Sequence, residues 1–435
     1  MKSKNDYFSS KWGLIFAAAG SAIGLGNIWL FPYRVGEFGG AIFIIPYMIC
    51  LIILGSIALI GEITIGRLTS SGPIGAFEKA LELDKKKNKS LGYGFGLICV
   101  FVALIQAIGY ILVVAWVIRF VLGSISGSAF YTNNSSQYFS FISNSNVMLW
   151  IIISLLITAV TVMKGVEKGI EKCCKIMIPG VIILLLILVV RVMFLPNAIH
   201  GYKYLFNPTK YYNLFNAKIW MFALGQVFYS LSIRGSTMVV YGSYVKKTQD
   251  IVFSAKSIVI LDTLASLLSV LLIIPAVFAF NKDLNSGPSL LFITMPEIFK
   301  NIPFGQFLMF IFFVAVFFAA LTSLIGMVEV AIEMLQNKFQ IPRFPSIILI
   351  CTLVGLTCKW FVIGNLTKII DMLSLHLIPL CALGSSIFTF WIIPKDVLYK
   401  EIQTGRAKKI SKFLIPMGRY ILCGSIILIY IMRLE

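Results

Sequence analysis

The stretch AAGSAIGLGN at residues 18–27 interrupts an apolar run that is long enough to cross a membrane, and Phe31-Pro32 follows it. Three glycines and an asparagine are poor helix formers. Backbone that is unwound inside a bilayer is tolerated only where it lines a cavity or meets a ligand. The stretch therefore indicates a broken helix at a binding site or, because small residues also let helices approach closely, a helix-packing face.

A second interruption favours the broken helix. The stretch GQVFYSLSIRGST at residues 225–237 again places polar groups and a glycine in the middle of an apolar run. It lies five spans after the first interruption, and because five is odd the two halves of the chain must have opposite orientations. Paired interrupted helices in an inverted repeat are typical of secondary transporters, which bind their substrate near the bilayer midplane.

The composition supports a membrane protein. Of the 435 residues, 59% are hydrophobic and only 13% are charged, whereas about a quarter of a soluble domain is charged. The net charge of +19 does not indicate nucleic-acid binding, because the basic residues are scattered over short loops between apolar runs rather than gathered on one face.

Eleven apolar runs approach or exceed the length of about 20 residues that a spanning helix needs. We therefore expect an all-α polytopic membrane protein with 11 transmembrane helices, arranged as a 5+5 inverted repeat in which helices 1 and 6 are broken. The expected spans are 12–36, 39–69, 91–123, 147–163, 169–195, 217–244, 251–280, 305–336, 345–363, 366–393 and 411–432.

The loop charges predict the orientation. About 23 Lys and Arg residues fall on the side of the N-terminus and about 8 on the other, so the N-terminus is expected in the cytoplasm and the C-terminus outside the plasma (inner) membrane. The expected parts are a cytoplasmic segment at 1–11, a first repeat at 12–195, an extracellular loop at 196–216, a second repeat at 217–393, and a cytoplasmic loop with the last span at 394–435.

Four long motifs resemble the neurotransmitter:sodium symporter family. They are KWGLIFAAAGSAIGLGNIWLFPY at 11–33, GGAIFIIPY at 39–47 with Glu62 and Gly66-Arg67 beyond it, GQVFYSLS at 225–232, and FFAALTS at 317–323. The resemblance runs from Lys11 to about Trp391, and bacterial members with eleven spans exist. It implies a leucine-transporter-like fold in which spans 1, 2, 6 and 7 form a moving bundle.

The resemblance implies two sodium sites. One would use the carbonyl oxygens of Gly20, Ile23 and Ala319 with the hydroxyls of Thr322 and Ser323. The other would use Ala22, Asn27, Ser230 and Asp262, completed by the substrate carboxylate. Ser230 stands where the family commonly has Thr, and Asp262 where it commonly has Asn. Both still offer oxygen ligands, which suit a hard cation.

The chloride cage of chloride-dependent members would map to Tyr47, Gln226, Ser230, Asp262 and Ser266. Because Asp262 already carries a negative charge, we expect it to replace chloride and transport to be chloride-independent. An intramembrane carboxylate is costly unless it pairs or serves a function. The alternative is a protonated Asp262 that is hydrogen-bonded to helix backbone.

The resemblance also implies a substrate pocket. It maps to Ser21, Ala22, Gly24, Gly26, Gln106, Tyr110, Val113, Tyr229, Ser230, Ser232, Arg234, Gly235, Ser323 and Met327. Tyr110 would donate its hydroxyl to the substrate carboxylate. Gly235 stands where an aromatic residue often closes the pocket. A larger amino acid, aromatic or with a polar tip, is therefore expected, and a neutral aromatic or large amino acid is the predicted substrate.

The gates depart from the family pattern. The outer-gate arginine of helix 1 is Leu30 here, although its expected partner Asp371 is present, so Arg34 one turn further on is a candidate replacement. Tyr110 and Tyr229 would close the pocket beneath. At the inner gate the family pairs an N-terminal arginine with an aspartate, whereas here Lys4 or Asn5 faces Asn337. This gate is therefore expected to be weakened, or rebuilt around Asp6, Tyr244 and Glu333.

Arg234 lies in the break of span 6, where a small residue is usual. An arginine at mid-membrane is functional by default and needs a named partner. Asp371, Asp262, an acidic group on the substrate, and a side chain that reaches the membrane surface remain open. Earlier in the chain, Gly169 and Pro179 allow the cytoplasmic end of span 5 to unwind, with an ordinary kinked helix start as the alternative.

The function predicted from these features is sodium-coupled import of an amino acid by alternating access. Two sodium ions and no organic cofactor are expected, and no nucleophile and base pair points to an enzyme. A symporter for an acidic or other polar amino acid or amine, and a sodium-dependent solute sensor that does not transport, remain alternatives. The expected partners are the small substrate and the lipid bilayer, with a monomer or a homodimer both open.

Overall fold

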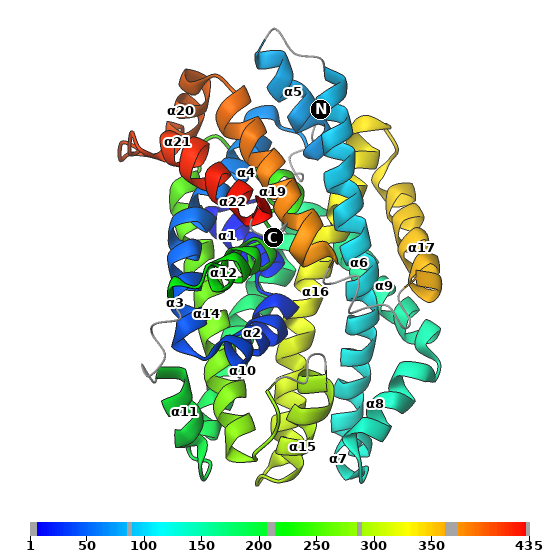
Figure 1. Cartoon of the computed structure of the whole chain (residues 1–435). Helices are drawn as coiled ribbons and strands as arrows, with labels where there is room; N and C mark the ends of the chain where they lie inside the picture. Colours follow the sequence, from blue (N-terminus) through cyan, green and yellow to red (C-terminus); the bar gives the residue numbers. More distant parts are fainter. Residues whose placement is uncertain (1–6, 85–88, 207–213, 285–288, 362–371, 432–435) are drawn as a thin grey trace.

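The computed structural model describes residues 7–84, 89–206, 214–284, 289–361 and 372–431, and every regular element in these ranges is a helix (Figure 1). Helices satisfy their backbone hydrogen bonds internally, which is what a spanning segment needs in lipid. The expected fold class is confirmed.

The first half of the chain contains five of the expected spans and the short helices between them. Their bounds are α1 Lys11–Ala22, η2 Gly26–Leu30, α2 Phe31–Phe38, α3 Ala41–Cys50, η3 Leu51–Gly55, α4 Ser56–Thr69, α5 Pro73–Leu83, α6 Lys89–Ser126, α7 Ser128–Tyr131, α8 Ser135–Asn144, α9 Val147–Met163, η4 Val166–Glu171, α10 Lys172–Met193 and α11 Ala198–Phe206.

The second half contains the other six spans. Their bounds are α12 Ala217–Ser230, α13 Thr237–Ser243, α14 Ile251–Ala279, η6 Leu290–Thr294, α15 Met295–Lys300, α16 Gly305–Lys338, α17 Arg343–Phe361, η7 Leu373–Leu377, α19 Ile378–Ile387, η8 Phe388–Ile392, α20 Lys395–Gln403, α21 Leu414–Pro416, η9 Met417–Leu422 and α22 Cys423–Ile431. The η elements are wider turns within otherwise continuous helices.

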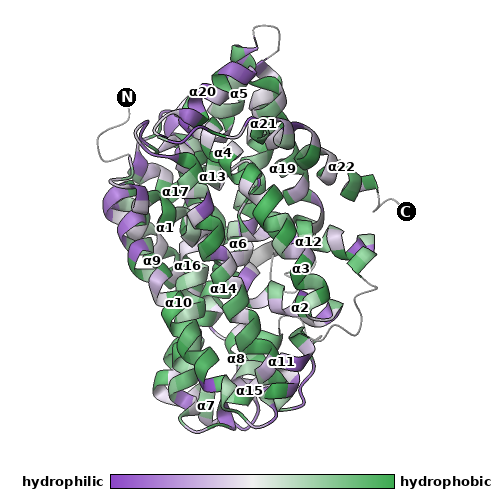
Figure 2. Ribbon diagram, turned by 90° about the vertical axis from the view of Figure 1, so that its left-hand side faces the viewer, coloured by the Kyte–Doolittle hydropathy of each residue, from purple (hydrophilic) through white to green (hydrophobic). Residues whose placement is uncertain are grey.

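Within the described ranges, six helices are long and apolar enough to cross a membrane, and three further pairs pass the same test with a bend between their halves. The first pair is span 1, which bends by 51° between Ala22 and Gly26. Figure 2 shows the apolar residues along the middle of the molecule and the polar ones mostly toward its ends.

Local sequence explains where several helices begin. The side chain of Asp250 accepts a hydrogen bond from the Phe253 amide at 3.0 Å and caps α14, and Asn216 caps α12 in the same way. Such caps satisfy amides that the first helical turn leaves unpaired. Gly39 and Gly40 both have positive φ angles, which lets the chain turn sharply from α2 into α3.

The two halves of span 6 pack mainly on different neighbours, whereas both halves of span 1 pack on α14. α12 packs on α3 and α13 on α4, while α1 lies against α10, α14 and α16. α5 and α20 lie at one end of the molecule, and α7, α8, α11 and α15 at the other (Figure 1). The breaks of spans 1 and 6 therefore meet in the interior between these ends.

Candidate substrate and sodium site

The break in span 1 brings its backbone against α16. Ile23 is extended, with φ −71° and ψ 102°, so the helix ends at Ala22. The Asn27 side chain accepts a hydrogen bond from the Gly24 amide at 3.1 Å. A Cβ atom at Gly24 would lie 2.5 Å from the hydroxyl oxygen of Ser323, so this close approach requires glycine.

The break in span 6 is held by a buried carboxylate. Between the end of α12 at Ser230 and the start of α13 at Thr237, Gly235 has a φ angle of +66°, in the region that favours glycine. Its amide donates to the Glu62 carboxylate on α4 at 2.6 Å. A side chain thus replaces the backbone acceptor that the unwound segment has lost.

The two breaks contact each other directly. The Ser232 hydroxyl donates to the Ser21 carbonyl at 2.7 Å, and the side-chain amide of Gln226 donates to the Gly26 carbonyl at 2.9 Å. These contacts join residues about 200 positions apart in the sequence. The two interruptions therefore form one site.

The five residues expected at the first sodium site lie together. The Ser323 hydroxyl is 3.2 Å from the Gly20 carbonyl and 3.4 Å from the Ile23 carbonyl. The Thr322 hydroxyl is 3.2 Å from the Ala319 carbonyl. All five groups are oxygens in a buried environment, which is the donor set that a hard cation prefers.

The residues expected at the second sodium site surround the Asp262 carboxylate. The Asn27 amide nitrogen donates to this carboxylate at 2.8 Å and lies 3.0 Å from the Ser230 hydroxyl. Ala22 lies at the break nearby and is 3% exposed. As placed, the Asn27 amide oxygen faces the Gly24 amide, so the carboxylate and the Ser230 hydroxyl are the oxygens that this cluster offers.

Most of the expected chloride cage also surrounds Asp262. The Tyr47 hydroxyl lies 3.3 Å from an Asp262 carboxylate oxygen and 3.3 Å from the Ser266 hydroxyl, and Ser230 contacts both carboxylate oxygens. Gln226 differs, because its amide nitrogen points to the Gly26 carbonyl. The carboxylate thus takes up hydrogen-bond donors that could otherwise hold an anion.

The remaining pocket residues are closed off from solvent. None of them is more than 7% exposed, the value for Tyr229. The others are Ser21, Gln106, Tyr110, Val113, Ser232, Ser323 and Met327. The Tyr110 hydroxyl lies 3.1 Å from a Cβ atom placed at Gly24, and the Tyr229 ring lies 2.8 Å from one placed at Gly26. Both tyrosines therefore lie against the first break.

Gly235 does not enlarge the pocket as expected. A Cβ atom there would lie 2.9 Å from the Cys99 sulfur and 3.3 Å from the Phe77 ring. The space that a side chain would need is already filled by α5 and α6. The glycine instead serves the left-handed backbone of the break.

Arg234 is completely buried, so a side chain that reaches the membrane surface is excluded. Its guanidinium donates to the Ser236 and Thr237 hydroxyls, each at 3.2 Å. The third nitrogen, Nη1, is buried and has no hydrogen-bond partner among the described residues. This leaves one charged donor unsatisfied next to the breaks.

The acidic neighbour of Arg234 is Glu62, which the sequence analysis did not weigh as a partner. Glu62 is the carboxyl group close enough for its charge to act on Arg234, and the Tyr110 and Tyr229 phenols also lie near the guanidinium. Asp262 is instead hydrogen-bonded as described above and is not the partner, and Asp371 lies outside the described residues. A carboxylate within a spanning segment is costly unless it is compensated, and that rule could have marked Glu62 as a residue in need of a partner, without showing which residue it meets.

The outer-gate candidate Arg34 bonds to Glu37 at 2.6 Å. Its guanidinium also lies over the Phe222 ring, 4.5 Å from the centroid. Leu30 stands where the family arginine is expected. Since Asp371 lies outside the described residues, the expected pairing of Arg34 with it stays a prediction.

At the expected inner gate, Tyr244 contacts Glu329, a buried residue that the sequence did not single out. The fully buried Glu329 accepts hydrogen bonds from the Tyr244 hydroxyl at 2.8 Å and from the Arg343 guanidinium at 2.7 Å. Glu333 accepts from the Gly72 amide at 2.5 Å and from the side-chain amide of Asn337, so a gate that includes Glu333 stays a prediction. The expected partners Lys4, Asn5 and Asp6 lie outside the described residues.

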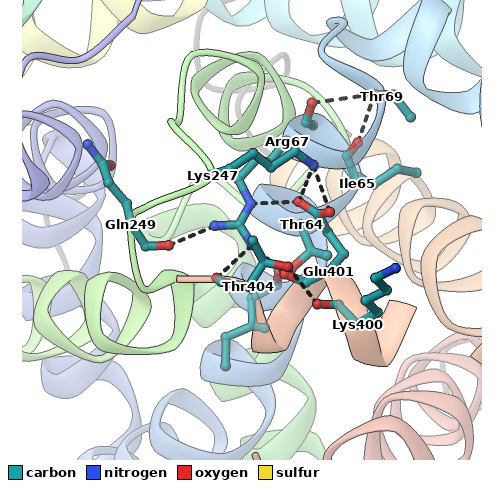
Figure 3. A network of polar contacts seen from close by, with 11 residues as sticks. Thr64, Ile65, Arg67, Thr69, Lys247, Gln249, Lys400, Glu401 and Thr404 are labelled. Carbon is teal, nitrogen blue, oxygen red and sulfur yellow. Dashed lines mark hydrogen bonds and ion pairs between the residues drawn. The ribbon is translucent and has the colours of Figure 1, made fainter. Parts of the chain in front are cut away.

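A buried arginine joins three elements at the same end of the molecule (Figure 3). Arg67 on α4 donates through Nε to Glu401 on α20 at 2.7 Å and through Nη1 to the Gln249 carbonyl at 2.7 Å. Lys247 pairs with the other Glu401 oxygen at 2.7 Å. Through these bonds the end of span 2 holds the loop after α13 and the short helix α20.

Span 5 begins as a helix in this structure and is not unwound. Gly169 lies in η4 and Pro179 inside α10. A Cβ atom at Gly169 would lie 2.1 Å from the Thr161 carbonyl, so the glycine also permits close packing on α9. Glu171 accepts a hydrogen bond from the Ser9 amide at 2.8 Å, which ties the start of the described chain to span 5.

Comparisons with known proteins agree with this architecture. The model of the sodium:neurotransmitter symporter family matches residues 5–141 and 126–433. The sodium-dependent transporter YhdH of Bacillus subtilis is 35% identical over 359 residues, which cover 81% of this chain and 78% of that protein. A sodium-dependent transporter of Haemophilus influenzae is 28% identical, with 98% of each chain covered.

A solved structure resembles the whole chain. The crystal structure of MhsT in complex with L-phenylalanine superposes with a TM-score of 0.88 at 28% sequence identity, covering 98% of this chain and 99% of that one.

Proposed function

The chain belongs to the sodium:neurotransmitter symporter family, and on this premise we propose that it imports an amino acid by alternating access, with two sodium ions and without chloride. The observation that carries the proposal is the meeting of the two helix breaks beside two clusters of buried oxygen groups. In such sites, freed carbonyls bind cations and half-helix ends bind the substrate carboxylate.

The first ion is assigned to Gly20, Ile23, Ala319, Thr322 and Ser323, whose oxygens converge. The second is assigned to Ala22, Asn27, Ser230 and Asp262, together with the substrate carboxylate. Asp262 balances the charge of the second ion, which is the role that chloride has in chloride-dependent members. The relatives are transporters, and no enzymatic step is proposed.

A large neutral or aromatic amino acid is the proposed substrate. Its carboxylate would lie at the first break, where the Tyr110 hydroxyl is close to Gly24. Support comes from MhsT, whose structure holds L-phenylalanine. The buried apolar side chains of Val113 and Met327 suit an apolar substrate.

An acidic or other polar substrate is the second candidate. The unsatisfied Nη1 of Arg234 favours it, because a substrate carboxylate would supply the missing acceptor. A sensor that binds sodium and solute without transport is a third candidate. The uptake experiment below distinguishes it from a transporter.

The test is uptake of a labelled amino-acid panel into proteoliposomes under an inward sodium gradient, with potassium replacing sodium as control. Two sodium ions crossing 100 mV with a zwitterion gain about 4.6 kcal/mol, which supports roughly thousandfold accumulation. Sodium-dependent accumulation of aromatic or large neutral substrates is expected. Accumulation of acidic substrates alone would establish the second candidate, and sodium-linked binding without uptake would establish the sensor.

The membrane arrangement is part of the proposal. We place the end with α5 and α20 in the cytoplasm of a cell whose plasma (inner) membrane holds the protein, as the loop charges favour. The bundle of spans 1, 2, 6 and 7, which combines helices of the repeats at 12–195 and 217–393, would rock against the other spans around the site. A monomer and a homodimer both suit this mechanism.

A further inference from the structure

A basic cavity lies outside the transport site, where span 4 meets span 5. Its volume is about 770 Å³, and Ser9 and Gly169 are among the residues that line it. Four lysines between the end of α9 and the first turn of α10 also line it, namely Lys164, Lys168, Lys172 and Lys175. Two acidic residues, Glu167 and Glu171, complete its charged lining.

Three of these lysines are free to bind a ligand. Lys175 is already paired with the buried Glu171 at 2.5 Å. Lys164, Lys168 and Lys172 are exposed and make no ion pair or hydrogen bond with other side chains in the described ranges. With Glu167 also unpaired, the open part of the cavity carries a net charge of +3 − 1 = +2. An anionic ligand would be attracted there.

An apolar groove, lined in part by exposed side chains, adjoins the cavity. It has a volume of about 440 Å³ and runs between α9 and α17, lined by residues such as Ile152, Leu156 and Ile348. Val160 lines both the groove and the basic cavity. Since a helix rises 1.5 Å per residue, the groove reaches at least about 12 Å from Val160 to Ile152, and half of a hydrocarbon core is about 15 Å thick.

We propose that this composite surface binds an anionic phospholipid. The phosphate would lie among Lys164, Lys168 and Lys172, and an acyl chain would follow the groove past Val160. Basic pockets beside transmembrane helices suit lipid phosphates, and only an amphiphile would fill both the charged and the apolar part. The ligand is thus a membrane lipid rather than a soluble anion.

Native mass spectrometry of the full chain in detergent tests the proposal. Dioleoyl phosphatidylglycerol and dioleoyl phosphatidylcholine are titrated separately, since their acyl chains are the same and only the headgroup charge differs. Phosphatidylglycerol is expected to bind at least about tenfold more tightly, and the triple substitution K164Q/K168Q/K172Q is expected to remove this preference. The control K408Q/K409Q/K412Q removes the same charge from exposed lysines of another loop and is expected to keep it.

Five outcomes would overturn the proposal. Equal binding of the two lipids would show that the cavity does not distinguish an anionic headgroup from a neutral one. An equal loss of the preference for phosphatidylglycerol in both triple variants would show that the preference depends only on the net charge of the protein. Displacement of the lipid by millimolar inorganic phosphate, or equally tight binding of dihexanoyl phosphatidylglycerol, would show that the groove holds no acyl chain. Release of the lipid when two copies associate would assign the groove to a second chain.

Discussion

The Ser230 hydroxyl lies 2.8 and 2.9 Å from the two carboxylate oxygens of Asp262. This contact links the break of span 6 to the middle of span 7. Because the carboxylate is fully buried, its charge is costly unless a nearby cation compensates it. A sodium ion in this cluster and the charge of Asp262 would therefore stabilise each other.

Removing this charge should create a need for chloride. In the variant Asp262→Asn the cage keeps its hydroxyl and amide donors but loses its fixed anion, so sodium uptake should now require chloride. The measurement is sodium-driven uptake into proteoliposomes with gluconate replacing chloride. Asp250→Asn removes a carboxylate from the same helix far from the site and should stay insensitive to chloride. Uptake by Asp262→Asn that persists at full rate without chloride would contradict the assignment.

A methyl group at the first break should weaken sodium binding. In Gly24→Ala the new Cβ atom would lie 2.5 Å from the Ser323 hydroxyl oxygen, which must turn away from its position among the carbonyls. Losing one such ligand should raise the half-saturating sodium concentration about tenfold. Gly94→Ala, where no atom lies within 4 Å of the Cβ position, is the control. A sodium dependence unchanged in Gly24→Ala would argue against Ser323 as a ligand.

The pair Glu329–Arg343 should hold the inner gate closed. Removing one partner of a buried ion pair costs about 3–5 kcal/mol, because the other charge is left uncompensated. Arg343→Gln should therefore lower both the melting temperature and uptake. The double variant Glu329→Gln/Arg343→Gln removes both charges and should recover much of the thermal stability. If the double variant is no more stable than Arg343→Gln, the two residues act independently.

The fold and the place of the site could be predicted because their signals are local. Glycines and polar residues at mid-depth mark both breaks, and the four motifs align the oxygen groups of Gly20 and Ser323 with a known pattern. The partners of Arg234 and of Tyr244 could not be predicted in this way. Glu62 and Glu329 come from other helices, and their approach depends on helix rotation and tilt, which apolar periodicity does not determine. The prediction that Gly235 enlarges the pocket was wrong for the same reason, because Phe77 and Cys99 from other helices fill that space.

The network around Arg67 should depend on the shape of the guanidinium and not only on its charge. Arg67 uses separate nitrogens for Glu401 and for the Gln249 carbonyl, whereas a lysine ammonium cannot match this planar geometry. Arg67→Lys should therefore lower the melting temperature by several degrees. Arg406→Lys is the control, because Arg406 pairs with Asp250 near the surface, where such pairs contribute about 0–1 kcal/mol. Equal losses in the two variants would show that Arg67 acts only as a charge.

Arg234 provides the sharpest test of the substrate class. If the substrate is neutral, the guanidinium stabilises the break through Ser236 and Thr237 and balances Glu62. Arg234→Gln should then lower uptake of all substrates together, and the additional change Glu62→Gln should restore part of it, because no buried charge is left unpaired. If the substrate is acidic, Arg234→Gln should remove its uptake selectively and Glu62→Gln should not restore it. Competition by a panel of unlabelled amino acids measures the order of preference in each variant, and an unchanged order is the expected result.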